Sequence, residues 1–306
     1  MQKGTRTVNA QESGIMLLGL PSTGKTTFLA ALWEVVSASE RSGLRLQHLY
    51  EGDRSHITAR HEEWLACKPV RRTTADQDPI SLSLRRTYDA RTLRLTIPDM
   101  SGETYRLQFE QRRWGSDFEE RFQSTTSLMV FVRSMAMKEP TPLSALAPAL
   151  REMGGGDGGI DSSDDAVGQP ASTESQARTW SLSTCCTQVK YVDLLQFIAH
   201  ARGGAPIRVA VVVSAVDELD GTELENKPAE FVRAKLALLH QFLVANPHRF
   251  TSRIYGISAQ GAKYTPESLA NLRSRDAAAD RIRVVEDGNT TTDITRPLSW
   301  LSFDEE

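Results

Sequence analysis

One short segment constrains this chain more than any other: Gly19–Thr26 has the form G-x-x-x-x-G-K-[ST]. The apolar run at 14–20 predicts a buried strand before it, and apolar residues at helical spacing follow it from Thr26 to Ser39. Glycines allow the loop to wrap its backbone N–H groups around an anion, and the positive end of the following helix points at the same place. The segment is therefore predicted to be a phosphate-binding loop.

The motif assigns roles to single residues. Lys25 is expected to reach the β- and γ-phosphates of a nucleotide, and the Thr26 hydroxyl to bind Mg²⁺. The other residues expected to contact phosphate belong to the loop or follow it directly: Gly19, Pro21, Ser22, Thr23, Gly24 and Thr27. An ordinary glycine-rich turn is the alternative, which the flanking strand and helix disfavour.

Strand and helix patterns alternate along the rest of the chain. Ile80–Arg85 and Thr92–Ile97 alternate polar and apolar residues around a turn, which indicates a β-hairpin. Apolar runs predict further strands at 127–132, 207–216 and 254–257, and helical spacing recurs at 57–65, 114–122, 189–198 and 232–243. This order favours an α/β fold with a mostly parallel sheet and helices on both faces. Ligands bind such sheets beyond the carboxyl ends of the strands, which here are followed by Leu20, Asp99, Asp217 and Ser258.

A second motif follows the hairpin. Asp99 comes directly after a predicted strand, which suits an acidic residue that holds Mg²⁺, although a turn aspartate after Pro98 is the alternative. Asp99 and Gly102 form the D-x-x-G pattern of GTPases. In that pattern the glycine N–H senses the γ-phosphate, and the next segment moves when phosphate leaves.

With a phosphate loop, a hairpin and D-x-x-G in this order, the chain resembles the Ras-like, translation-factor-related (TRAFAC) class of P-loop GTPases over about residues 14–261. The resemblance implies a mostly parallel six-stranded sheet with one antiparallel hairpin strand. It also implies Mg²⁺ as the cofactor, and a threonine before the hairpin, Thr73 or Thr74, that completes the coordination of the ion.

The resemblance also names candidate catalytic residues besides Lys25. Arg71 or Arg72 lies where heterotrimeric G-protein α subunits carry a catalytic arginine in cis, and exposed loop arginines are the alternative. Glu103 lies where many members of the class have a water-positioning glutamine. Its carboxylate could act as a base or hold water, and hydrolysis is expected to be slow or to need a partner.

Two loops match the base-recognition loops of the class. Asp217 matches the aspartate of [NT]-K-x-D, which accepts hydrogen bonds from guanine N1 and N2, while Ser214 replaces the Asn or Thr and Ala215 the Lys. Ser258, Ala259 and Gln260 match the S-A-x loop, in which the Ala259 N–H would contact guanine O6. The resemblance therefore implies guanine rather than adenine as the base.

Composition sets the broad class of protein. The 306 residues carry a net charge of −3, so no basic field points to nucleic acid, and apolar runs such as Val209–Val213 are far too short to span a membrane. Three cysteines without metal spacing favour a cytoplasmic protein.

The same patterns predict the domain organisation. We expect a flexible N-terminus over 1–13 and one GTPase domain over 14–306, with insertions at about 40–72 and 136–186. Gly, Ser and Asp dominate residues 153–183, which predicts disorder there.

More narrowly, the chain resembles the bacterial double-GTPase families of conflict and defence operons. The residues that carry this likeness are Trp64, Pro69, Arg72-Thr73, Asp217-Glu-Leu and the Pro-Leu-x-Trp-Leu ending. It implies a partner GTPase or effector protein. Two functions stay open at this point: a GTP-hydrolysing switch, and an assembly module that binds GTP with little turnover. A P-loop ATPase is a third alternative.

Overall fold

The computed structural model describes residues 13–38, 42–51, 54–71, 80–89, 91–97, 108–111, 113, 122, 125–135, 137–140 and 185–303. Residues 1–12, the segment 153–183 and almost all of the helix expected over 114–122 lie outside these ranges.

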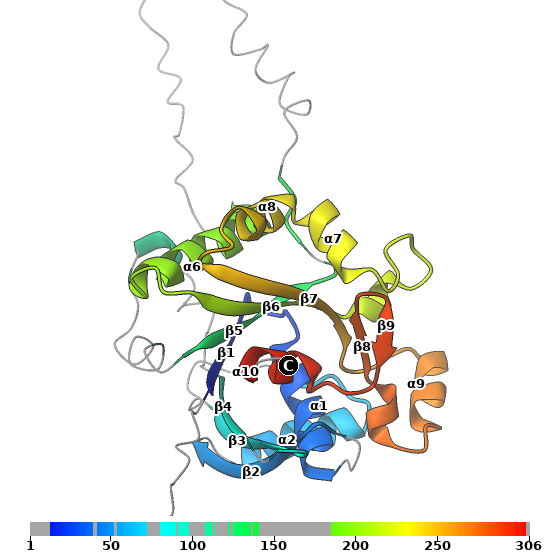
Figure 1. Ribbon diagram of the computed structural model, residues 1–306. Coiled ribbons are helices and arrows are strands. Elements are labelled where there is room, and N and C mark those ends of the chain that lie inside the picture. The colour runs from blue at the N-terminus through cyan, green and yellow to red at the C-terminus, as the bar shows by residue number, and fades with distance from the viewer. Residues whose placement is uncertain are drawn as a thin grey trace, which may run out of the picture.

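One mixed sheet organises the described residues, with the strand order β2-β3-β4-β1-β5-β6-β7-β8-β9 (Figure 1). The strands β4, β1, β5, β6 and β7 run parallel, while β2 and β3 at one edge and β8 and β9 at the other pair antiparallel. The strand bounds are β1 (Ser13–Gly19), β2 (Leu44–Glu51), β3 (Ile80–Arg86), β4 (Thr92–Ile97), β5 (Ser127–Arg133), β6 (Ile207–Ser214), β7 (Phe250–Ser258), β8 (Arg283–Glu286) and β9 (Asn289–Thr291).

The expected number of strands is wrong: across the described residues the sheet has nine strands, not six. Strands β3, β4, β1, β5, β6 and β7 have the expected arrangement, with β3 as the antiparallel hairpin strand. The sequence did not reveal β2 because its register shifts between Leu46 and His48, and again between Leu49 and Glu51, which breaks the alternation typical of a strand. With four and three residues, β8 and β9 are too short to show a period.

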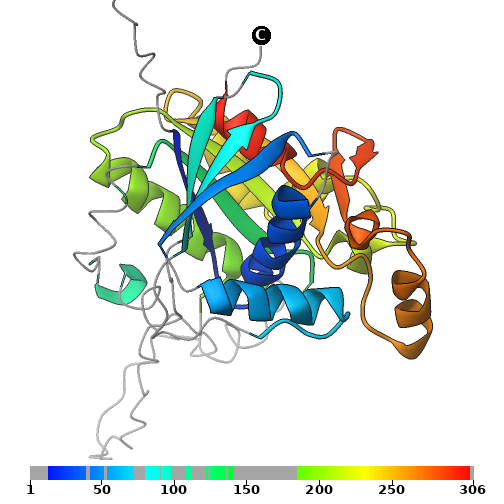
Figure 2. The same ribbon diagram turned by 90° about the horizontal axis from the view of Figure 1, so that it is seen from below.

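Helices cover both faces of the sheet, as the alternating patterns predict. Figure 1 shows α6, α7 and α8 on one face and α1, α2 and α10 on the other, and Figure 2 shows α2 crossing α1. The helix bounds are α1 (Lys25–Ala38), α2 (Arg54–Leu65), α6 (Thr187–Ala201), α7 (Pro228–Lys235), α8 (Ala237–Ala245), α9 (Pro266–Arg273) and α10 (Arg296–Ser302), with short 3-10 helices η1 (Val216–Leu219) and η2 (Ala278–Arg281).

The packing of β1 on both of its faces explains why its sequence is apolar throughout. Ile15 and Leu17 pack into the core beneath α1, whereas Met16 and Leu18 pack into the core beneath α6. Successive side chains of a strand point to opposite faces, so a strand covered on both sides needs apolar residues at every position. The continuous apolar run is therefore what places the phosphate loop at the end of a central strand.

The apolar pattern over 232–243 predicts one helix, and the structure has two. Leu236 leaves the helical conformation, with φ −128° and ψ 46°, between α7 and α8. Its N–H still donates to the Val232 carbonyl, the His240 N–H donates to the Leu236 carbonyl, and its side chain stays buried. Because the apolar spacing continues across the break, the pattern does not reveal it.

The C-terminal helix α10 docks on the sheet near the amino ends of β5 and β6. Trp300 is buried, and the Ser127 hydroxyl donates to the Leu301 carbonyl over 2.8 Å. None of the helices in the described ranges has the length and apolarity needed to cross a membrane.

Candidate nucleotide-binding site

The predicted phosphate loop joins the end of β1 to the start of α1. Gly19 lies so close to its neighbours that a Cβ there would stand 2.7 Å from Thr23 Oγ1 and 2.9 Å from the carbonyl oxygen of Phe131. The Thr23 hydroxyl donates to the Leu20 carbonyl over 2.8 Å and closes the turn. Ser22 and Gly24 have φ angles of 66° and 85°, left-handed values that turn the backbone into the loop.

Lys25 brings a cation into this loop. Its Nζ donates to the Gly19 carbonyl over 2.5 Å and to the Leu20 carbonyl over 3.1 Å. Thr26 and Thr27 follow in the first turn of α1 and are half-buried. An ammonium group and the positive end of a helix thus lie together, a combination that favours a phosphate anion.

The phosphate loop lies directly against the end of β6. A Cβ on Gly24 would stand 3.4 Å from Cβ and 3.5 Å from Oγ of Ser214. The Ser214 hydroxyl donates to the Val132 carbonyl over 3.2 Å, so this side chain is fixed against β5. Ser214 therefore joins the loop predicted to bind phosphate to the first of the loops predicted to bind the base.

The two predicted base loops also meet. Ser258, the fully buried last residue of β7, donates its hydroxyl hydrogen to Asp217 Oδ1 over 2.5 Å. The same hydroxyl accepts a hydrogen bond from the Gly261 N–H over 3.0 Å, while Gln260 Nε2 donates to the Ala262 carbonyl. One serine therefore orders both the turn at 258–261 and the carboxylate of the other loop.

Burial dominates the electrostatics of Asp217. Loss of solvation raises the pKa of its carboxyl above the ordinary value, while the hydrogen bond from Ser258 acts in the opposite direction. Ala215, two residues earlier, has φ 55° and ψ 44°, a left-handed conformation that turns the chain into η1. Asp217 is therefore an acceptor held in a setting with little competing water.

Sequence reasoning missed the residues that support this turn from β5. The Ser134 hydroxyl contacts both the Ala215 carbonyl, over 2.8 Å, and the Glu218 carboxylate, over 3.1 Å. Arg133 forms an ion pair with Glu218 over 2.9 Å. The only local signal was the pair of polar residues, Arg133 and Ser134, that ends the apolar run of β5.

Tyr264 is a second residue that the sequence did not single out. Its hydroxyl is buried, and among the described residues no hydrogen-bond partner reaches it. Burial raises its pKa to about 12, and the charges of Cys67, Arg281 and Asp217 also act on it. A buried hydroxyl without a partner in the described structure, three residues after the turn at 258–261, is suited to contact a ligand at this loop.

Of the residues expected near the γ-phosphate outside the phosphate loop, the structure places only Arg71 within its described ranges. Arg71 is 89% exposed, and both its Nε and its backbone N–H lie 2.9 Å from the carboxylate of Glu63 on α2. The remaining predicted site residues lie outside the described ranges: Arg72, Thr73, Thr74, Asp99, Gly102 and Glu103. Their roles stay predictions.

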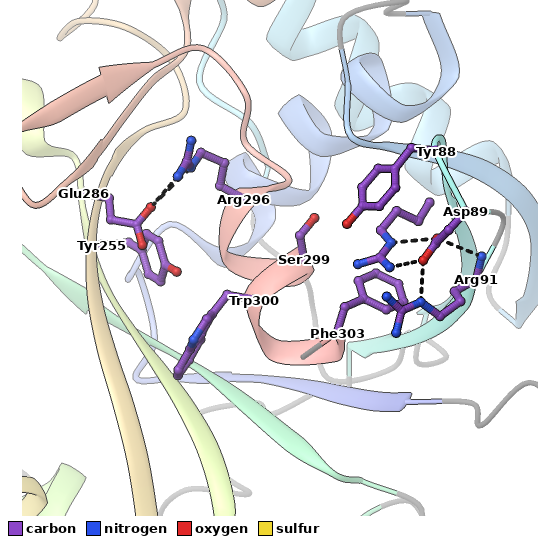
Figure 3. A pocket seen from close by; sticks show the side chains of 10 residues that line it. Tyr88, Asp89, Arg91, Tyr255, Glu286, Arg296, Ser299, Trp300 and Phe303 are labelled. Atoms are coloured by element: carbon purple, nitrogen blue, oxygen red, sulfur yellow. Dashed lines mark hydrogen bonds and ion pairs between the residues drawn. The ribbon is translucent and has the colours of Figure 1, made fainter. Parts of the chain in front are cut away.

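A cavity of about 620 Å³ lies elsewhere, between the β3–β4 hairpin and α10 (Figure 3). Arg86 and Arg91 both pair with Asp89 there, and Arg296 pairs with Glu286. The hairpin turn lies at the amino end of β4, opposite the edge that carries the phosphate loop. Because carboxylates already neutralise these arginines, the cavity is not suited to a polyphosphate.

A comparison with protein families agrees with the motifs. A family model described as "DO-GTPase1: Double-GTPase 1" matches residues 16–301. Among solved structures, one similar chain comes from the signal recognition particle receptor SRb-GTP/SRX complex of Chaetomium thermophilum. It is 14% identical, with a TM-score of 0.38, and the match covers 86% of this chain and 96% of that chain. No curated protein matches the chain.

Proposed function

The chain belongs to the Double-GTPase 1 family of P-loop GTPases, and from that premise we propose that it binds GTP at Gly19–Thr27 and hydrolyses it as a molecular switch. One observation carries the proposal. Gly24 of the phosphate loop contacts Ser214, while Ser258 and Asp217 are hydrogen-bonded to each other at the ends of the neighbouring strands. Groups suited to phosphate and groups suited to a purine thus share one edge of the sheet.

Lys25 supports the phosphate half of the proposal. Its ammonium group already lies over the loop, held by two carbonyl oxygens that a phosphate could replace as acceptors. Phosphate oxygens carry full negative charge, so the exchange strengthens the hydrogen bonds of the lysine. The Gly24 and Thr26 N–H groups at the start of α1 would add neutral donors.

Asp217 supports guanine as the base. A carboxylate only accepts hydrogen bonds, and guanine offers it two donors, N1–H and the amino group at C2. Adenine has an acceptor at N1 and no amino group at C2, so it would offer the half-buried carboxylate no donor on this edge. The Ala259 N–H is proposed to donate to guanine O6, which lies next to N1 on the same edge of the base.

The oxygen ligands available near the phosphate loop are of the type that Mg²⁺ prefers. Thr26 offers a hydroxyl in the first turn of α1, beside Lys25, and oxygen ligands are those that this ion prefers. We propose that Thr26, Asp99 and either Thr73 or Thr74 hold the ion. When bound, Mg²⁺ neutralises charge on the phosphates.

We propose that residues around the γ-phosphate carry out the hydrolysis. Glu103 would orient or deprotonate the attacking water, and Gly102 would donate its N–H to the γ-phosphate. Arg71 or Arg72 would stabilise the charge that develops on the phosphates. Because Arg71 pairs with Glu63, its use in catalysis would require that ion pair to open. Alanine at both arginines is expected to slow single-turnover hydrolysis, and an unchanged rate would remove them from the mechanism.

We further propose a regulatory role with a partner GTPase or effector, in signalling of the bacterial conflict or defence type. The family description names a double GTPase, which supports a second GTPase subunit as the partner. The expected observation is faster phosphate release when a co-encoded GTPase is added. An unchanged rate would argue against activation by that partner.

Calorimetric binding of GTP, GDP and ATP with Mg²⁺ tests the proposed function. We expect both guanine nucleotides to bind more tightly than ATP. Lys25→Ala should weaken GTP binding by about ten- to a hundredfold, because charge-assisted hydrogen bonds to phosphate are lost. Phosphate release at saturating GTP then separates the switch from the alternative suggested by Glu103, an assembly module with little turnover. Preference for ATP would overturn the guanine assignment.

A further inference from the structure

We propose that Trp64 is a positioning residue for guanine recognition: from helix α2 it holds Ala259 in the orientation that reads guanine O6. Trp64 lies well before the first base loop in the sequence and is fully buried. Its Nε1 donates to the Ala259 carbonyl over 2.9 Å. This inference deepens the proposed function and rests on it.

The indole is itself held in place by Arg281. The guanidinium of Arg281 lies 4.3 Å from the centre of the Trp64 ring. Its Nη1 donates to the Trp64 and Leu65 carbonyls and to Cys67 Sγ, and its Nε donates to the Ala278 carbonyl. A buried arginine with these partners fixes the end of α2 against η2, so the indole N–H has little freedom to turn away from Ala259.

The base loop is closed against the same arginine. A Cβ on Gly261 would stand 2.6 Å from the Arg281 carbonyl oxygen, so the loop backbone packs directly on η2. At its other end, Ser258 bonds to Asp217. The loop Ser258–Gly261 is thus held on one side by the predicted base-binding carboxylate and on the other side by Trp64 and Arg281.

The hydrogen bond from Trp64 controls the direction of the Ala259 N–H because both involve the same residue. Ala259 belongs to two peptide groups: its carbonyl accepts from Trp64, and its N–H is the proposed donor to O6. Planar peptide groups leave one residue only two soft torsions, so fixing the carbonyl restricts the direction of the N–H. Removal of the indole N–H would also leave a part-buried carbonyl without that donor, and the loop would rotate to find another.

The same helix also contacts Arg71, at the start of the segment expected to supply a Mg²⁺ ligand. Helix α2 is followed by Arg71, whose backbone N–H and side chain both bond to Glu63 on the same helix. The helix that holds the base loop therefore also holds the start of the segment containing Arg72, Thr73 and Thr74.

The test compares GDP with 6-thio-GDP, which keeps N1–H and the C2 amino group but replaces O6 by sulfur, a weak acceptor. Trp64→Phe keeps a buried ring and removes the donor. We expect GDP affinity to fall about three- to tenfold, the usual worth of one hydrogen bond, with 6-thio-GDP changing less than about twofold. The matched control is Trp300→Phe: Trp300 is also buried beneath an arginine, at 5.1 Å from Arg253, but at the opposite edge of the sheet.

Each outcome decides the inference. Equal losses for GDP and 6-thio-GDP, or no loss for either, would overturn it, because a merely structural tryptophan does not act through O6. If Trp64→Phe fails to fold, Arg281→Lys decides instead. That variant keeps the cation and the indole but not the planar fork, and the same selective loss for GDP is expected. Wild-type protein that binds GDP no better than ADP would refute the proposed function itself, which is a separate result.

Discussion

The Ser258 hydroxyl and the Asp217 carboxylate form a 2.5 Å hydrogen bond between two loops that follow neighbouring parallel strands. The pairing of Ser214 with Ile257 at the ends of β6 and β7 brings these loops together. Burial of Asp217 makes its charge depend on such partners, because water does not fully solvate it.

Asp217→Asn is expected to change which base the protein prefers. An amide offers one acceptor and one donor, so it matches the C2 carbonyl of xanthine better than the C2 amino group of guanine. We expect GDP affinity to fall at least tenfold and XDP affinity to rise, since one mismatched polar contact in a buried site has about this effect. Calorimetry with both nucleotides measures the change, and Asp276→Asn on the exposed surface is the control. A parallel loss for GDP and XDP would contradict the assigned contact.

The raised pKa of Asp217 predicts a dependence of stability on pH. A carboxyl whose pKa in the folded protein exceeds its unfolded value contributes stability at low pH, and that contribution is lost as pH rises through the folded pKa. Asp217→Asn removes the titration. The free energy of unfolding of the variant, relative to wild type, should therefore increase as pH rises from 4 towards 7. Urea unfolding without nucleotide measures it, and a difference that stays flat or declines would be inconsistent with a raised pKa.

Gly19→Ala should destabilise the fold through steric overlap. Its new Cβ would meet Thr23 Oγ1 at 2.7 Å and the Phe131 backbone at 2.9 Å, so neighbouring atoms must shift, at a cost of about 1–3 kcal/mol. Gly204→Ala is the matched control, because Gly204 has φ +81° and nothing within 4 Å of the added atom. That control should lose only about 1 kcal/mol, from the left-handed backbone. Equal losses in urea unfolding would exclude crowding as the cause at Gly19.

Tyr264→Phe is expected to leave stability unchanged or to raise it by about 1 kcal/mol, because the hydroxyl removed is buried without a partner in the described structure. If this hydroxyl contacts the nucleotide, GDP affinity should fall about three- to tenfold at the same time. Tyr191→Phe should have the opposite effect on stability, since the Tyr191 hydroxyl donates to the Phe131 carbonyl over 2.6 Å. Thermal unfolding and calorimetry on the three proteins distinguish these outcomes, and a loss of stability in Tyr264→Phe would mean that the hydroxyl has a partner.

Sequence patterns predicted elements whose signal is local. The hairpin strand expected at Thr92–Ile97 has these bounds in the structure, and the apolar runs before Gly19 and Asp217 became β1 and β6. These elements were predictable because a buried strand shows its burial in its own residues. Strands β2, β8 and β9 were not, since irregular register or short length removes the period. They form because β2 pairs with β3, β8 with β7 and β9 with β8.

In the candidate site, too, some features could be predicted from local sequence and others only from the folded structure. The phosphate loop and the positions of Asp217 and Ser258 at strand ends follow from motif spacing and from the rule for parallel sheets. The hydrogen bond between those two residues, the contact of Gly24 with Ser214 and the support from Ser134 do not, because each joins segments far apart in the chain. The roles of Asp99 and Glu103 stay predictions.

Local pattern was thus enough to recognise a strand, a phosphate loop and a helix in succession, because a covered strand and an anion cradle impose their requirements on adjacent residues. Folding alone brought Trp64 to Ala259, 195 positions later in the chain. A hydrogen bond depends on distance in space, and packing sets that distance through the path of every element between its two ends.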